Sequence, residues 1–369
     1  MDQVRLTGGV LLGALVSGAL AAGSLGTAQP ANASCISAFG LGNGNGCTSN
    51  LTTIAIGIGD GAVANSAGAL FSGAFAWGAN SNATVGISAL TFAAAIGDGA
   101  TSTALTSIGS IGAQIGSGAT AIVGALNLAV GISPTGGQNT SVIGLGNVAM
   151  NVGAGTTAAI GALNLALGYS PDGVGAHSSG ASGVGNIAAQ FGAGTTLIFG
   201  GLNLAVGVSP DPAGAQTTNV GGFLSSALNV GNNSNVLSQG VISSAVNLLA
   251  DDSSVSAGGP LPNTILSLAL NTLGSGNTVT VGPGPFALGA SIGQAGATVT
   301  RVGPGFNING LGADSAAPSN ARPSTSAAPI PSTHSAKRSS VQAAASPGGK
   351  HRKDGTGNTK TATGKRSAR

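Results

Sequence analysis

Large apolar residues followed by glycine recur along this chain at intervals of nineteen residues. They are Phe39, Ile58, Trp77, Ile96 and Ile115 in the first third, and Leu273, Ile292 and Leu311 in the last. The same phase continues between the two blocks at Val152, Phe191, Val230 and Leu249, where two units together span 37 to 39 residues. A fixed short period over most of a chain is typical of stacked repeats, so the pattern predicts a solenoid with coils of about 19 residues.

A turn-forming residue follows these positions at a fixed distance. Three residues later stand Gly42, Gly61, Asn80, Gly99, Gly118, Gly155, Gly194, Asn233, Asp252, Gly276 and Asp314, and only Ala295 departs from the rule. Glycine, asparagine and aspartate tolerate positive φ, which predicts a tight turn at one corner of every coil. The apolar stretches between corners are too short and too interrupted by glycine for helices. We therefore expect an all-β fold, a single-chain β-solenoid of the β-helix or β-roll type.

An asparagine recurs in a second register, in the motif Asn-[Leu/Val/Ile]-Ala. It occurs once per coil through the middle of the chain, at Asn127, Asn147, Asn164, Asn186 and Asn203. Side-chain amides at the same place in successive coils can donate and accept hydrogen bonds along the stack. We expect these five residues to form a structural Asn ladder.

Composition extends this picture to one elongated body over residues 34–312. Apolar residues make up 42% of the chain but aromatic residues only 3%, which predicts a narrow interior packed with Ala, Val, Ile and Leu. At a spacing of about 4.8 Å, roughly fourteen coils would make a rod on the order of 65 to 70 Å long. The mean hydropathy of +0.37 argues against the alternative of a disordered Gly-rich polymer.

Residues 1–33 have the pattern of an export signal. Arg5 precedes an apolar run, and small residues flank Asn32 before Ser34, so we expect a signal helix that is cleaved between Ala33 and Ser34. The alternative is an uncleaved helix that anchors the protein in the membrane. In an exported chain the only two cysteines, Cys35 and Cys47, are predicted to form a disulfide that staples the first coil. A metal site is the rival, but two cysteines without a neighbouring histidine are insufficient.

Charge is concentrated in residues 313–369, an Ala/Pro/Ser-rich segment that is predicted to be a disordered tail. It carries ten Lys and Arg against two Asp, whereas residues 34–312 carry Arg301 against six Asp. The basic residues include Lys337, Arg338, Lys350, Arg352, Lys353, Lys365 and Arg366. They predict a tether to an anionic polymer such as envelope polysaccharide or acidic lipid. Nucleic acid is less favoured because no aromatic residue is interleaved with the charges.

Candidate chemistry is sparse. The chain has no glutamate; Asp60, Asp98 and Asp251 share one corner phase and are interpreted as turn residues. His177 lies in a glycine-rich stretch and is interpreted as a solvated loop histidine. We predict no enzyme activity, no cofactor and no metal. The alternatives are a β-helix carbohydrate-active enzyme, which would need clustered carboxylates, and an ice-binding solenoid, for which only Thr278-Val-Thr280 and Thr298-Val-Thr300 are aligned.

Two stretches, Ala55–Ala62 and Ala95–Ala100, resemble the head repeats of trimeric autotransporter adhesins, in which Ala-Ile-Gly and small-residue turns recur. That resemblance implies a β-roll that binds surfaces. The whole chain resembles secreted Gly/Ala/Asn-rich proteins of mycobacteria, which implies secretion or cell-wall association. Together these features predict an exported, non-enzymatic structural or adhesive protein of the cell envelope. They leave open whether several copies associate.

Overall fold

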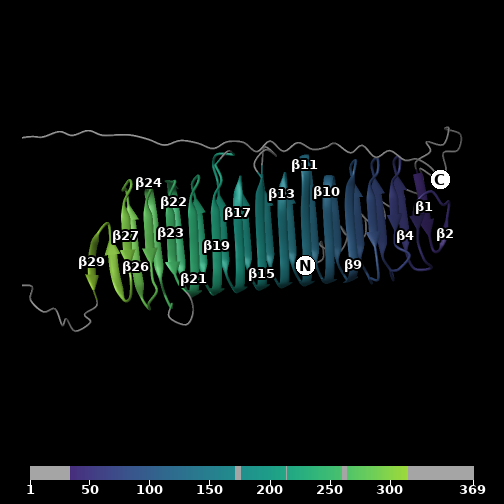
Figure 1. Ribbon diagram of the computed structural model, residues 1–369. Coiled ribbons are helices and arrows are strands. Elements are labelled where there is room, and N and C mark those ends of the chain that lie inside the picture. The colour runs from purple at the N-terminus through teal and green to yellow at the C-terminus, as the bar shows by residue number, and fades with distance from the viewer. Residues whose placement is uncertain (1–33, 171–175, 213, 260–263, 315–369) are drawn as a thin grey trace, which may run out of the picture. The chain divides into compact units, whose positions relative to one another are not determined.

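The computed structural model describes residues 34–170, 176–212, 214–259 and 264–314. This part of the chain is all-β and forms a parallel β-solenoid of about 13 coils, about 19 residues apart (Figure 1). The solenoid expected from the periodicity is thereby confirmed. The expected signal helix with its cleavage position at Ala33, and the basic residues from Lys337 to Arg366, lie outside the described residues.

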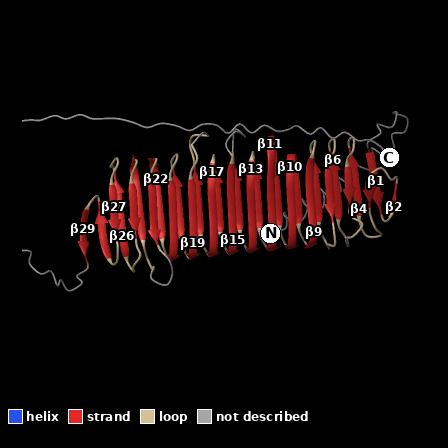
Figure 2. Cartoon of the chain, in the orientation of Figure 1, coloured by secondary structure: helices blue, strands red, loops and turns tan. Residues whose placement is uncertain are grey.

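Each coil contributes one strand to each of two flat sides, which we name sheet A and sheet B (Figure 2). Sheet A contains β4 (Ile54–Ile58), β6 (Gly73–Trp77), β8 (Phe92–Ile96), β12 (Val148–Val152), β14 (Leu165–Tyr169), β16 (Ile187–Phe191), β18 (Leu204–Val208), β20 (Ser226–Val230), β22 (Ser244–Asp251), β24 (Leu268–Ser275), β26 (Ala287–Ile292) and β28 (Gly305–Ile308). Sheet B contains β3 (Cys47–Thr48), β5 (Val63–Asn65), β7 (Asn82–Val85), β9 (Ala100–Ile108), β13 (Gly155–Ala162), β15 (His177–Val184), β17 (Gly194–Gly201), β19 (Thr217–Phe223), β21 (Asn235–Val241), β23 (Ser254–Gly258), β25 (Thr278–Val281) and β27 (Thr298–Arg301). The long strands β10 (Ile111–Ala125) and β11 (Leu128–Leu145) turn a corner and belong to both sheets.

We call the turn from sheet A to sheet B the first corner and the turn back to sheet A the second corner. At the first corner, the predicted residues adopt positive φ at Gly61, Asn80, Gly99, Gly118, Gly155, Gly194, Asn233, Asp252 and Gly276. Aspartates also join coils there. The carboxylate of Asp98 accepts a hydrogen bond from the N–H of Ala79, at 2.7 Å, and Asp251 binds the N–H of Asn232 in the same way.

The apolar residues that recur every nineteen residues occupy one position of the strand ladder on sheet A, with two kinds of exception. Ile58, Trp77, Ile96 and Ile115 pair in register, and the ladder continues to Val230. Beyond it, Leu248 and Thr272 occupy the ladder, while Leu249 and Leu273 lie one residue later at positive φ. Phe39 and Leu311 lie outside the ladder because they belong to the antiparallel ends of the solenoid.

The interior differs from the expected Ala, Val, Ile and Leu core. On sheet A, an alanine column fills it, formed by Ala129, Ala149, Ala166, Ala188, Ala205, Ala227, Ala245 and Ala269. Sheet B contributes mainly Val, Ala and Thr, and no leucine is among the buried side chains of the described residues. Isoleucine is buried at Ile122 and Ile198, but most of the large aliphatic residues face outward.

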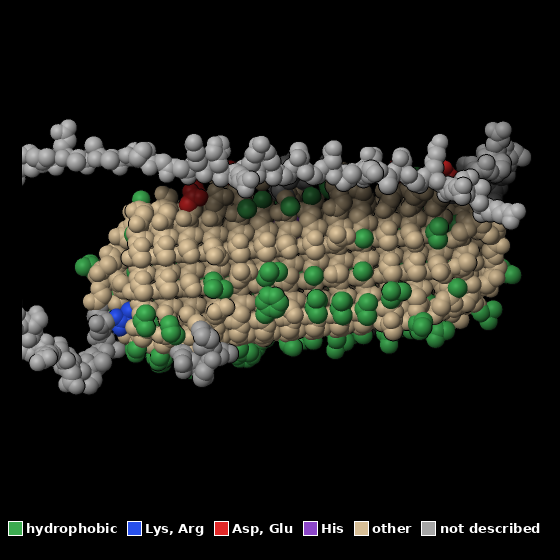
Figure 3. All heavy atoms as spheres, viewed as in Figure 1, with side chains coloured by type: hydrophobic (Ala, Val, Ile, Leu, Met, Phe, Trp, Pro, Cys, Tyr) green, Lys and Arg blue, Asp and Glu red, His purple; other side chains and the backbone are tan. Residues whose placement is uncertain are grey.

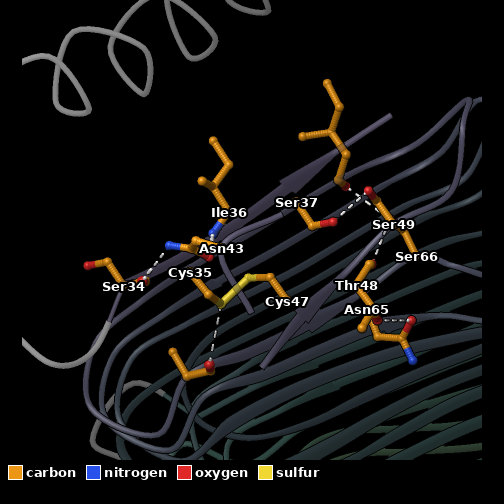
Figure 4. Close-up of a disulfide and its surroundings, with 12 residues drawn as sticks. Ser34, Cys35, Ile36, Ser37, Asn43, Cys47, Thr48, Ser49, Asn65 and Ser66 are labelled. Carbon is orange, nitrogen blue, oxygen red and sulfur yellow. Dashed lines mark hydrogen bonds between the residues drawn. A yellow bond between two sulfur atoms is a disulfide. The ribbon is translucent and has the colours of Figure 1, made fainter. Parts of the chain in front are cut away.

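Antiparallel strands close both ends of sheet A. At the N-terminal end, β1 (Ser34–Ala38) pairs with β4 and with β2 (Leu41–Gly42). At the C-terminal end, β29 (Leu311–Asp314) pairs with β28. The predicted disulfide between Cys35 and Cys47 is present and ties β1 to β3, across the two sheets (Figure 4). It therefore fixes the closing hairpin to the first coil.

Candidate functional site: two outer faces and a polar interior

The outer face of sheet B carries rows of hydroxyl and amide side chains. One row consists of Val63, Asn82, Thr101, Ala119, Asn139, Thr156, Ser178, Thr195, Thr217, Asn235, Ser254, Thr278 and Thr298, paired in register. Eleven of these thirteen residues are polar, and none is charged. The second row is more mixed but contains Thr84, Thr103, Ser141, Asn219, Ser256, Thr280 and Thr300. Figure 3 shows this face, with apolar side chains gathered toward one edge.

The sequence reveals only part of this surface. The pairs Thr278/Thr280 and Thr298/Thr300 were recognisable because they repeat the same residue at the same spacing. Further toward the N-terminus, Thr, Ser and Asn replace one another, so the row has no fixed motif. Only the strand register brings Asn139, Thr156 and Ser178 into one line.

The outer face of sheet A has the opposite character. Its central row is Ile56, Phe75, Ala94, Ala113, Val130, Met150, Leu167, Ala189, Val206, Leu228, Val246, Leu270 and Ala290. The apolar residues that recur every nineteen residues, such as Ile58, Trp77 and Ile96, form a second row beside it. Trp77 in that row is 56% exposed. Along the three outward rows of the parallel strands, the side chains that carry a nitrogen or oxygen atom are Trp77, Tyr169, Ser226, Ser244 and Thr272. Sheet A is therefore apolar across its outer face, whereas sheet B is polar toward the first corner. Toward the second corner sheet B carries an exposed apolar row, which includes Leu105, Val123, Ile143, Ile160 and Phe199.

Large apolar residues also occupy the second corner, where they adopt positive φ. Leu90, Leu126, Leu163 and Leu202 alternate there with Gly109, Gly146 and Gly185. Each glycine lies under the leucine of the next coil. A Cβ on Gly146, for example, would come within 3.0 Å of Leu163 Cδ2, so the glycine leaves room for the leucine side chain. Bulky residues at positive φ are strained and persist only where surrounding structure holds them. Because coils with leucine and coils with glycine alternate at this corner, the structural repeat there comprises two coils, which together span 37 to 39 residues.

The five predicted ladder asparagines lie in one buried column just after the second corner. Each side-chain Oδ1 accepts a hydrogen bond from the backbone N–H of the next member, at 3.0 Å from Asn127 to Asn147 and at 2.9 Å from Asn147 to Asn164. The pattern continues through Asn186 and Asn203 to Ser225. Serine takes the same position at both ends, as Ser110 and Ser225.

A column of stacked glycines accepts the other hydrogen bonds of this ladder. Gly124, Gly144, Gly161, Gly183, Gly200, Gly222 and Gly240 pair in register, with φ between 111° and 122°. The Nδ2 of Asn164 donates to the carbonyl of Gly183, one coil further along, at 2.8 Å. Asn203 donates in the same way to Gly222 at 2.9 Å. The glycine backbone therefore turns its carbonyls toward the amides of the ladder.

A second polar column fills the interior near the first corner. On sheet A the ladder reads Gln114, Gly131, Asn151, Gly168, Gln190 and Gly207, and on sheet B it reads Gly118, Gln138, Gly155, His177 and Gly194. Long polar residues and glycines thus alternate in opposite phase. A Cβ on Gly168 would overlap the ring of His177, so the glycine provides the room for the imidazole.

His177 is therefore not the solvated loop residue expected from its glycine-rich surroundings, because it begins β15 and is only 3% exposed. Its Nε2 lies 2.8 Å from Oδ1 of Asn151, whose Nδ2 donates to the carbonyl of Gly155 at 3.0 Å. The amide oxygen can only accept, so Nε2 carries the proton. Burial disfavours the charged ring and lowers the pKa of His177 from 6.5 to about 4.

This shift predicts a loss of stability in mild acid. The unfolded chain binds a proton at His177 near pH 6.5, whereas the folded chain binds it only near pH 4. The stability that neutral His177 contributes is thus fully present above pH 6.5. As the pH falls toward 4, the free energy of unfolding decreases by about 3 kcal/mol. Urea unfolding at several pH values should show the loss.

The His177→Gln variant is the matched control, since glutamine occupies the same ladder two coils away, at Gln138. The difference in unfolding free energy between the variant and the natural protein should change by about 3 kcal/mol between pH 7 and pH 4. A constant difference across this range would show that His177 is not buried in its neutral form.

Other features bear on candidate chemistry. Among the described residues, no three His, Cys, Asp or Glu side chains lie close enough together to hold a metal ion. The same ranges contain no helix long and apolar enough to span a bilayer.

No protein-family model matches the chain, no curated protein matches its sequence, and no solved structure matches it. Function must therefore be inferred from the geometry of the two faces.

Proposed function

We propose that this chain is an exported, non-enzymatic structural or adhesive protein of the cell envelope. The proposal rests on the uncharged rows of Thr, Ser and Asn on sheet B, which present hydroxyl and amide groups on successive coils. The groups repeat about every 4.8 Å along the solenoid and about every 6.6 Å along each strand. A regular polymer with many hydroxyl groups, such as an envelope polysaccharide, can form weak hydrogen bonds at many of these points at once.

The basic segment adds a second attachment in this proposal. Residues 313–369 carry ten Lys and Arg against two Asp, and they include Lys337, Arg338, Lys350, Arg352, Lys353, Lys365 and Arg366. The positive charges of this segment attract an anionic polymer or acidic lipid over distances of about a Debye length. The segment would concentrate the protein at the envelope, and the sheet B face would then bind the neutral polysaccharide.

Ice binding is a second candidate, favoured by one observation. Thr278 and Thr280 lie in register with Thr298 and Thr300 at the C-terminal end of sheet B. Elsewhere the rows mix Asn, Ser, Ala and Leu, which a flexible polymer tolerates better than a crystal lattice does. Thermal hysteresis of the purified protein would favour the ice-binding candidate.

Binding to isolated cell envelope tests the proposal. Deletion of residues 315–369, which leaves β29 intact, should release most of the protein at physiological salt, because only the weak polysaccharide contacts remain once the basic residues are removed. In the full chain, the triple variant Thr156→Ala, Thr195→Ala and Thr217→Ala should lose several-fold in the binding that resists high salt. Sedimentation with the envelope measures both.

The control is Ser226→Ala with Ser244→Ala, which removes hydroxyl groups from sheet A and should leave binding unchanged. If the deletion variant stays bound as well as the full chain, the charged tether is wrong. If the sheet B variant binds like the control, the polar rows are not the attachment surface.

A further inference from the structure

The outer face of sheet A is too apolar for a surface that stays in contact with water. Its strands are apolar on the outer side and carry the alanine column beside the polar column on the inner side; in β11, Ala129 faces the interior and Leu128, Val130 and Ile132 face outward. Parallel sheets with such continuous apolar strands are normally covered on both faces. Sheet B covers the inner face of sheet A, and among the described residues nothing covers the outer face.

The size of this face matches a stable protein interface. Thirteen coils at about 4.8 Å, with five residues per strand, give an area of roughly 1,000 Å². Monomeric proteins seldom expose apolar patches beyond a few hundred Å². A standard interface buries about 800 Å² on each partner, so the face is large enough for one.

We propose that sheet A is the interface of a homodimer, in which two copies of this chain pack sheet A against sheet A. Flat aliphatic faces of two sheets pack about 10 Å apart, and a two-fold axis makes one face serve as both halves of the interface. The proposal is independent of the polysaccharide-binding function. The dimer leaves both sheet B faces exposed on its opposite sides.

The charge around the face favours a second copy over a lipid surface. Helices and sheets that lie on membranes carry Lys and Arg at their borders, which attract anionic headgroups. In the described ranges Arg301 is the one Lys or Arg, and it is only 9% exposed. The first corner, which borders sheet A, carries Asp60, Asp98 and Asp251 instead. An anionic bilayer would repel this border, whereas a second copy need not contact it.

Analytical ultracentrifugation of the full chain should give a dimer of twice 34.4 kDa at micromolar concentration. The variant Met150→Lys with Leu167→Lys, at the centre of the interface, should weaken association at least about a hundredfold, because it buries unpaired charges. The matched control Thr156→Lys with Ser178→Lys places the same charges on sheet B and should remain dimeric.

Trp77 provides a second readout, because it is the only tryptophan and lies on the same face, four coils from Met150. Its fluorescence should be blue-shifted and protected from acrylamide in the dimer, and exposed in the lysine variant. The milder Leu167→Thr variant repeats the test, with about a tenfold weakening, should the double variant fail to fold.

Several results would overturn the proposal. A monomeric natural protein that binds neutral phosphatidylcholine vesicles would assign the face to lipid. Filaments that lengthen with concentration would show a heterologous contact instead of a closed dimer. A dimer that persists unchanged in the sheet A variants, with Trp77 still protected, would place the interface elsewhere.

Discussion

Replacement of Gly222 by alanine is expected to destabilise the solenoid by about 4 kcal/mol. Gly222 lies in β19 with a φ of 122°, which an L side chain rarely adopts. A Cβ there would overlap the carbonyl oxygen of Gly240 in the next coil, and a backbone group cannot move aside as a side chain can. The two coils would have to separate, and the hydrogen bond from Asn203 to Gly222 would be lost with them. Urea unfolding followed by circular dichroism measures the effect.

Gly221 offers a control one residue away in the same strand. Its Cβ would meet only Cγ of Gln239, at 3.9 Å, and its φ is not in the left-handed region. Alanine at position 221 should therefore change stability by less than about 1 kcal/mol. Equal effects at positions 221 and 222 would contradict the stacked-glycine arrangement.

Replacement of Asn164 by leucine is expected to cost about 3 kcal/mol, although the two side chains have similar shapes. The Asn164 amide is 1% exposed and donates to the carbonyls of Ile160 and Gly183, each at 2.8 Å. Its Oδ1 accepts from the N–H of Asn186 at 3.0 Å. Leucine cannot form these bonds, so buried donors and acceptors on two neighbouring coils would lose their partner. The free energy of unfolding in urea measures the loss.

Two further variants make the result specific. Asn139→Leu, on the exposed face of sheet B, should change stability by less than about 0.5 kcal/mol. Asn164→Ser should lie between these extremes, because Ser225 continues the ladder in the protein itself through its bond to Gly240, at 3.1 Å. The ladder would be unimportant for stability if Asn164→Leu were as mild as Asn139→Leu.

Much of the fold could be predicted because the relevant signals are local. Residues that tolerate positive φ mark the first corner, as at Gly61, Asn80 and Asp252. Coil length follows from the distance between these turns, and the disulfide follows from two cysteines in one short segment. Stacking can even be anticipated where one residue type repeats exactly, as at Asn147 and Asn164.

Other features could not be predicted, because they depend on how neighbouring coils align. Leu126 and Leu163 adopt positive φ at the second corner, where residue type alone would exclude it. His177 is buried because Gly168 faces it from the opposite sheet, and nothing in its own glycine-rich segment indicates this. Leu249 and Leu273 keep the nineteen-residue spacing in the sequence, but they lie one residue after the positions that pair in the ladder.

The sequence by itself determined that this protein winds into short coils with glycine-rich corners, and that two cysteines join its first strands. Only the tertiary structure decided which residues face outward, and hence that sheet A is apolar outside while sheet B carries the polar rows. The reason is the two-residue period of a strand, since a shift of one residue at any corner moves every following side chain to the other face. Pairing between coils sets that register.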